Sequence, residues 1–212
     1  MFHRLTILLS AVVLAAGCTS VKYSALEKVG VYKRDILVDR VEDAQDAQLE
    51  AKEEIASAYE QFTGLVQFDG GDLEATYKRL NAKVEDTRDS VDEVDRRIAA
   101  IERVAGDLFD EWRDELDQYS NASLRRASEQ KLEDTKRRYG SMIATMKHAR
   151  SRIDPVLSVF EDQVLFLKHN LNARAVAALK GEVGNIGGKV DRLIQDMNKA
   201  IAEADSFIQT MK

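Results

Sequence analysis

The chain has 212 residues, with 31 Lys and Arg against 37 Asp and Glu, and a formal net charge of −6 at pH 7. This acidic balance disfavours non-specific binding to nucleic acid, which needs clustered basic side chains. The chain has one cysteine and three histidines, so no intrachain disulfide can form and side-chain packing must hold the fold.

The N-terminus has the pattern of a bacterial signal peptide. Arg4 precedes an apolar run from Leu5 to Leu14, which is shorter than the about 20 residues that a membrane span needs. The segment Leu14-Ala15-Ala16-Gly17-Cys18 then resembles a lipobox. This resemblance implies that residues 1–17 are cleaved and that Cys18 carries several lipid chains, which anchor a protein firmly. The alternative is an ordinary secretory signal with an incidental cysteine.

The residue after the cysteine bears on the location of the protein. Lipoproteins with Asp at this position are retained in the inner membrane, whereas this chain has Thr19. The resemblance therefore implies an outer-membrane lipoprotein of the bacterial cell envelope that faces the periplasm.

Beyond Cys18, apolar residues recur every three or four positions, which is typical of coiled coils, and no run has the alternation of a strand. We expect one domain over 18–212 with helices at about 21–66, 72–118, 122–169 and 173–211. Each helix carries two lines of apolar positions with a spacing of seven residues. In the first helix these lines are Leu37, Ala44, Ala51, Ala58 and Leu65, and Val41, Gln48, Ile55 and Phe62.

Three short breaks separate the helices. Asp69-Gly70-Gly71 is turn chemistry, Asp72 can cap the helix that follows, and Ser120-Asn121 and Asn170-Leu171-Asn172 mark the other turns. Short connections make consecutive helices antiparallel neighbours. We therefore predict an all-α, elongated, up-down-up-down antiparallel four-helix bundle or coiled coil, roughly 65 Å long at 1.5 Å per residue. Helical hairpins that pair with a second copy are the alternative.

Two helix-disfavouring features match in position. Pro155 and Gly187 each lie sixteen residues from Leu171, so an antiparallel hairpin brings them to the same height. Together with Gly184 and Gly188 they predict a hinge. The alternative is that small residues let two helices approach closely. A continuous fourth helix through Gly188 would argue against the hinge.

One apolar run is wider than a helix seam requires. The run is 164–167, at the end of the bundle farthest from Cys18, where residues 65, 66 and 68 are also apolar. These side chains either close the end of the core or form an exposed patch for a protein partner or a second copy. The candidate patch consists of Leu65, Val66, Phe68, Leu165 and Phe166.

The sequence contains no recognisable catalytic or cofactor motif. Gly188-Lys189 is followed by Val190, so it fails the phosphate-loop pattern. His148 and His169 lack the Glu-x-x-His spacing of di-iron bundles, and no Ser-His-Asp arrangement is present. We therefore predict a protein that is not an enzyme and that uses no metal and no cofactor.

Two segments resemble a known family. They are 27–38, which reads EKVGVYKRDILV, and 59–71, in which YEQFTGL leads into FDGG. The resemblance is to an uncharacterised bacterial envelope lipoprotein family, a domain of unknown function with a long helical coiled-coil body. It covers nearly all of the chain after Cys18, implies a helical lipid-anchored protein, and supplies no activity or functional residues.

These features favour a lipid-anchored, non-enzymatic periplasmic scaffold, spacer or protein-interaction module, which meets the membrane through its N-terminal lipid. The alternative is a four-helix-bundle carrier or sensor for a small ligand or metal. A scaffold is expected to have a dry apolar interior, whereas a carrier needs a cavity with converging polar groups.

Overall fold

The computed structural model describes residues 32–68, 70 and 72–212. The predicted signal peptide, Cys18 and the predicted helix start at residue 21 lie outside these residues. The described part is helical and shows no strand, so the predicted all-α class is confirmed. Its elements are α2 (Lys33–Val66), α3 (Leu73–Leu116), α4 (Ala122–His169), α5 (Ala173–Ala178), a 3-10 turn η1 (Leu179–Glu182) and α6 (Val183–Met211).

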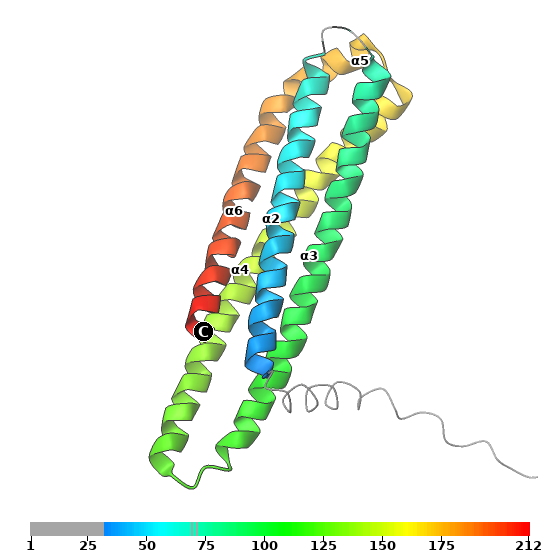
Figure 1. Ribbon diagram of the computed structural model, residues 1–212. Coiled ribbons are helices and arrows are strands. Elements are labelled where there is room, and N and C mark those ends of the chain that lie inside the picture. Colours follow the sequence, from blue (N-terminus) through cyan, green and yellow to red (C-terminus); the bar gives the residue numbers. More distant parts are fainter. Residues whose placement is uncertain (1–31, 69, 71) are drawn as a thin grey trace, which may run out of the picture.

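The four long helices form one antiparallel bundle (Figure 1). Helix α2 packs against α3 and α6, and α4 packs against the same two helices from the opposite corner. The short α5 and η1 lie across the end that also holds the α2–α3 turn, which we call the distal end. At the other end, the α3–α4 hairpin extends past the start of α2 (Figure 1). A single chain therefore completes the bundle without a second copy.

The predicted seams line the core. All nine seam positions of the first predicted helix are buried in α2, because their spacing of seven keeps them on one face. Near the distal end, the rings of Phe62 and Phe160 meet edge to face, with centroids 6.3 Å apart. Tyr119 follows Trp112 at the same spacing of seven in the sequence, but α3 ends at Leu116, so Tyr119 lies beyond the helix and is 42% exposed.

Polar side chains begin three of the helices. Asp72 Oδ1 accepts a hydrogen bond from the Ala75 amide at 3.0 Å, as its position in the sequence predicts. Asn121 Oδ1 accepts from the Ser123 amide at 2.9 Å and starts α4, and Asn172 caps α5. These caps satisfy amides that the helix itself leaves unpaired.

The fourth predicted helix, 173–211, is divided in the structure. Six residues form α5, four form η1, and α6 then runs to Met211. The chain has to cross the distal end before it descends along the bundle, and Gly181 in η1 has weak helix propensity. The tighter 3-10 turn accommodates this change of direction.

Candidate functional site

The interior of the bundle is almost wholly apolar. Among the described residues the buried polar side chains are Gln48, Thr87 and Thr135. Thr87 Oγ1 donates to the Lys83 carbonyl oxygen at 2.8 Å, and Thr135 Oγ1 donates to that of Lys131 at 2.8 Å, so each hydroxyl is satisfied within its own helix. Gln48 is 1% exposed, and neither its Nε2 nor its Oε1 has a hydrogen-bond partner. The described core therefore holds no convergent polar set.

A further polar side chain on the inner side of the helices lies near the α3–α4 turn. Ser128 is half-buried and its Oγ accepts a hydrogen bond from Trp112 Nε1 at 2.9 Å. Further along the bundle, Tyr139 packs edge to face on Phe109, with ring centroids 5.4 Å apart. Burial raises the pKa of Tyr139 to about 12, so this hydroxyl stays protonated at physiological pH.

The described residues bring no metal-binding group together. None of their His, Cys, Asp and Glu side chains gather in a set of three or more suited to an ion. His148 lies on the surface with its Nε2 4.0 Å from Asp196 Oδ2, and His169 is exposed at the end of α4. None of the described helices combines the length and the apolar character that crossing a membrane requires.

The predicted hinge residues lie within unbroken helices. Pro155 is exposed inside α4, and Gly184, Gly187 and Gly188 lie inside α6, which is continuous from Val183. This continuity argues against a joint at the glycines, and the irregular backbone lies earlier, in η1.

Close packing accounts for the most buried of these glycines. A Cβ atom on Gly187 would lie 2.4 Å from Tyr59 Oη. The same hydroxyl donates to the Val183 carbonyl oxygen at 3.3 Å. Tyr59 therefore holds the start of α6 against α2, in a space that residue 187 leaves open by having no side chain.

Two glycine substitutions in α6 should distinguish a hinge from close packing as the reason for these glycines. Gly184→Ala should raise the free energy of unfolding by about 1 kcal/mol, because a Cβ there meets nothing within 4 Å and alanine favours the helix. Gly187→Ala should not show this stabilisation, because Tyr59 must move to make room for the added Cβ atom. Urea denaturation measures the free energy of unfolding of both variants. Adding Tyr59→Phe to Gly187→Ala should recover part of the stability that this variant lacks relative to Gly184→Ala. Equal stabilisation by the two alanines would contradict the close-packing account.

The candidate patch at the distal end divides into two parts. Leu65 and Val66 are 0% and 2% exposed, and Phe68 is half-buried against the core. Leu165 and Phe166 are 59% and 41% exposed. The first three residues therefore close the end of the core, whereas the last two, which we call the distal pair, face solvent. The structure does not gather all five into one exposed patch.

A shallow groove of about 220 Å³ lies beside the distal pair, between α3 and α4. Leu165 lies on its wall, together with the nearly buried Val84 and Val164. Arg88 of α3 and Glu161 of α4 form an ion pair across it. An apolar depression with a charged border suits an apolar side chain of a protein partner.

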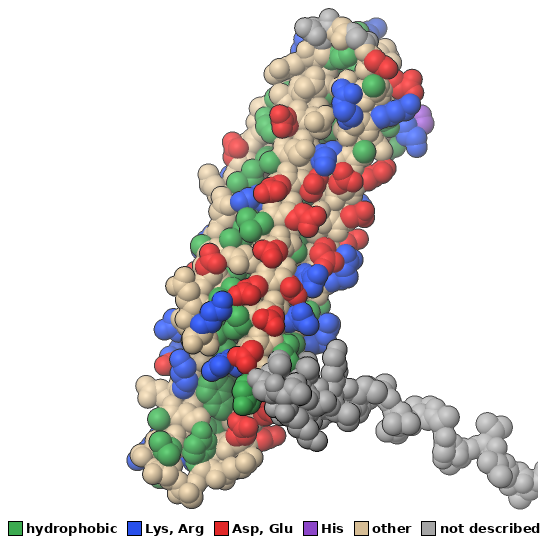
Figure 2. Space-filling model, viewed as in Figure 1, with side chains coloured by type: hydrophobic (Ala, Val, Ile, Leu, Met, Phe, Trp, Pro, Cys, Tyr) green, Lys and Arg blue, Asp and Glu red, His purple; other side chains and the backbone are tan. Residues whose placement is uncertain are grey.

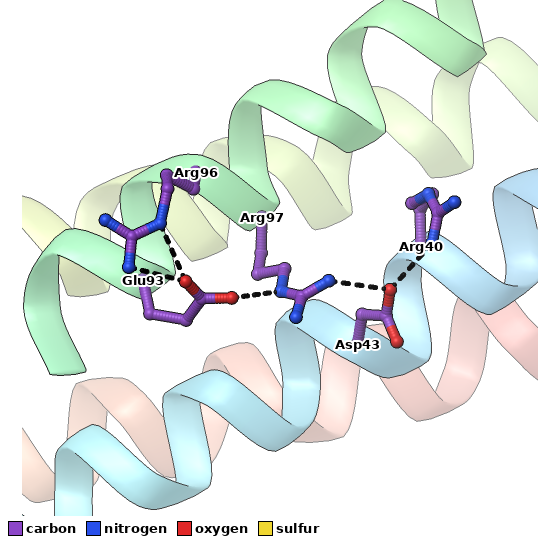
Figure 3. Close-up of polar contacts among 5 residues, drawn as sticks. All are labelled: Arg40, Asp43, Glu93, Arg96 and Arg97. Atoms are coloured by element: carbon purple, nitrogen blue, oxygen red, sulfur yellow. Dashed lines mark hydrogen bonds and ion pairs between the residues drawn. The ribbon is translucent and has the colours of Figure 1, made fainter.

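A ladder of charged side chains joins α2 to α3 (Figure 3). Asp43 Oδ2 accepts from Arg40 Nη1 at 2.8 Å and from Arg97 Nη1 at 3.0 Å. Arg97 also donates to Glu93, which accepts from Arg96 Nε at 2.7 Å. The hydrogen bond from Arg96, followed by the bond and charge of Arg97, lowers the pKa of Glu93.

Similar pairs occur farther along the α2–α3 contact and between α3 and α4. Lys83 Nζ lies 2.8 Å from Glu54 Oε2, and Arg150 Nε lies 2.7 Å from Asp95 Oδ1. Acidic and basic side chains both lie along the visible face of the body, with the acidic ones most numerous in its middle (Figure 2). Exposed pairs contribute little free energy, but opposite charges across these contacts favour one register between neighbouring helices.

The fold and surface define an elongated antiparallel four-helix bundle with an apolar core. The chain belongs to the family described as "Protein of unknown function (DUF2959)", whose model matches residues 22–211. The comparison with curated proteins and the comparison with solved structures each find no match. The resemblance to a domain of unknown function is thereby confirmed.

Proposed function

We propose that this protein is a lipid-anchored, non-enzymatic scaffold or spacer of the bacterial envelope, which faces the periplasm from the outer membrane. The observation that carries the proposal is the lipobox-like segment Leu14–Cys18, which the elongated helical bundle follows in the chain. Lipid chains on Cys18 would supply the anchor, and the bundle would supply a body of fixed length.

The direction of the helices supports the spacer role. Helix α2 is the first described helix after Cys18 in the chain; it begins at the end of the bundle opposite the distal end and has 34 residues, which span about 50 Å. The distal pair, Leu165 and Phe166, lies at the far end of the bundle. An anchored molecule would therefore present this exposed apolar pair well away from the membrane, where a protein partner or a second copy can reach it.

The carrier or sensor alternative has one observation in its favour, which is the unpartnered amide of Gln48. A carrier needs several polar groups that converge on a cavity. Thr87 and Thr135 use their hydroxyls within their own helices instead. The scaffold is therefore the better-supported function.

Acylation of Cys18 tests the anchor. In bacterial cells that express the full chain, radiolabelled palmitate should enter the wild-type protein and not Cys18→Ser. Mass spectrometry of the wild-type N-terminal peptide should show Cys18 as the first residue, with its lipid chains. A wild-type protein that keeps a free thiol at Cys18 would contradict the proposal.

A photo-crosslinking residue placed at Phe166 in intact cells tests the scaffold role. We expect a defined protein adduct from this position. Position 158 in the same helix is the matched control, because Ser158 is also exposed but lies outside the distal pair. Identical adduct patterns at both positions, or none at either, would count against a partner at the distal pair.

A further inference from the structure

The α3–α4 hairpin projects from the end of the bundle where α2 begins. Lys33, the first residue of α2, pairs its Nζ with Glu111 Oε1 at 2.6 Å, whereas α3 continues to Leu116. On α4, the ring of Tyr139 packs against Phe207 near the end of α6, seventeen residues after α4 begins. The hairpin therefore extends about 8 Å past the start of α2, and farther past the end of α6 (Figure 1).

The end of this hairpin, residues 117–128, is called the tip here. It carries two exposed apolar side chains, since Leu124 is 57% exposed and Tyr119 is 42% exposed. The hydrogen bond from Trp112 Nε1 to Ser128 Oγ ties the two arms together. The exposed side chains are thus presented by a braced hairpin.

The charge of the tip differs from that of the bundle body. The tip, residues 117–128, contains one acidic side chain, Asp117, and two basic ones, Arg125 and Arg126. Arg125 Nη2 lies 2.9 Å from Asp117 Oδ1, and Arg126 makes no ion pair among the described residues. In Figure 2 the lowest part of the molecule shows hydrophobic and basic side chains among backbone and uncharged polar side chains, with the acidic side chains above it. Tyrosine, leucine and arginine together suit the headgroup layer of a bilayer.

We propose that the tip rests in the headgroup layer of the bilayer to which the protein is anchored. This inference rests on the proposed function, because it takes Cys18 as the lipidated residue. Cys18 lies fourteen residues before Tyr32, so the chain between them spans at most about 50 Å. The anchor consequently holds the end where α2 begins, and with it the tip, within about 50 Å of the membrane, whereas the distal end lies about 50 Å farther along α2.

The contact would give the molecule a second attachment besides its lipid. Leu124 and Tyr119 would enter the interface, while Arg125 and Arg126 would donate hydrogen bonds to lipid phosphates. Two attachments fix an orientation that a single lipid attachment leaves free. The bundle would then stand with the distal pair directed away from the membrane.

Quenching of a fluorescent label on the reconstituted, lipidated full-length protein tests this contact. Cys18 is the only cysteine, so after its acylation an introduced cysteine is the only free thiol. Leu124→Cys and Tyr119→Cys place a label on the tip, and Leu165→Cys is a matched control, because Leu165 is 59% exposed at the opposite end. Vesicles of phosphatidylethanolamine and phosphatidylglycerol carry nitroxide-labelled lipid, and iodide serves as the aqueous quencher.

We expect the nitroxide lipid to quench the two tip labels several-fold more than the label at position 165, and iodide to show the reverse order. Equal quenching at positions 124 and 165, in protein whose Cys18 is acylated by mass spectrometry, would overturn the tip contact and leave the proposed function intact. An unmodified Cys18 would overturn both.

Discussion

Replacing Phe62 by alanine should lower the free energy of unfolding by about 3–5 kcal/mol. Phe62 is 0% exposed and its ring packs edge to face on that of Phe160, which is 1% exposed. The substitution removes most of a large buried side chain at the distal end and leaves a cavity between α2 and α4. Urea denaturation followed by circular dichroism measures the change.

Phe166→Ala is the matched control for this prediction. It removes the same atoms at the same end of the molecule, but Phe166 is 41% exposed. Its cost should stay within about 1 kcal/mol, because the side chain already contacts water. A loss as large as that of Phe62→Ala would mean that Phe166 is covered in solution, and would place the distal pair in a self-association interface.

Much of the bundle is predictable from the sequence. The burial of Phe62 follows from the spacing of seven that connects it to Ile55 and Gln48, since a helix keeps such positions on one face. The caps at Asp72 and Asn121 were also predictable, because side-chain oxygens at these positions pair with the first free amides of a helix. Local rules and periodicity thus account for the four-helix bundle.

Other features depend on three-dimensional contacts that periodicity does not encode. Leu165 and Val164 are adjacent and both apolar, yet a rotation of about 100° along the helix exposes one and buries the other. The need for glycine at 187 comes from Tyr59, which is 128 residues earlier in the chain. The break at η1 depends on how the chain crosses the distal end. For these reasons the hinge, the five-residue patch and the unbroken fourth helix could not be decided from the sequence.

Gln48→Leu should raise the free energy of unfolding by about 1–3 kcal/mol, which is the range for removing a buried polar group without a partner. Gln48 is 1% exposed, and no atom of its side-chain amide forms a hydrogen bond. Leucine has a similar size and no polar atom to desolvate. For a chain of this length, each kcal/mol should raise Tm by about 2–4 °C. Thermal and urea unfolding check the result.

Thr87→Val is the control, because Thr87 is equally buried but its hydroxyl already donates to the Lys83 carbonyl oxygen. Its effect should be smaller than that of Gln48→Leu, since the substitution exchanges a satisfied hydroxyl for a methyl group. A destabilised Gln48→Leu protein would show that the amide is satisfied by bound water, and that removing it leaves a polar space unfilled.

The stabilised variant should also reveal why a polar residue occupies this seam position. A lone buried amide in a coiled coil can select one register and one number of helices at a cost in stability. Gln48→Leu makes the α2 seam apolar along its whole length, so alternative pairings of the four helices become less unfavourable. We therefore expect light scattering to detect oligomers of Gln48→Leu at concentrations where the wild-type protein and Thr87→Val have the same, smaller mass. A stable variant with the wild-type mass would show that the charged pairs between helices, such as Arg97 with Asp43, are sufficient to fix the register.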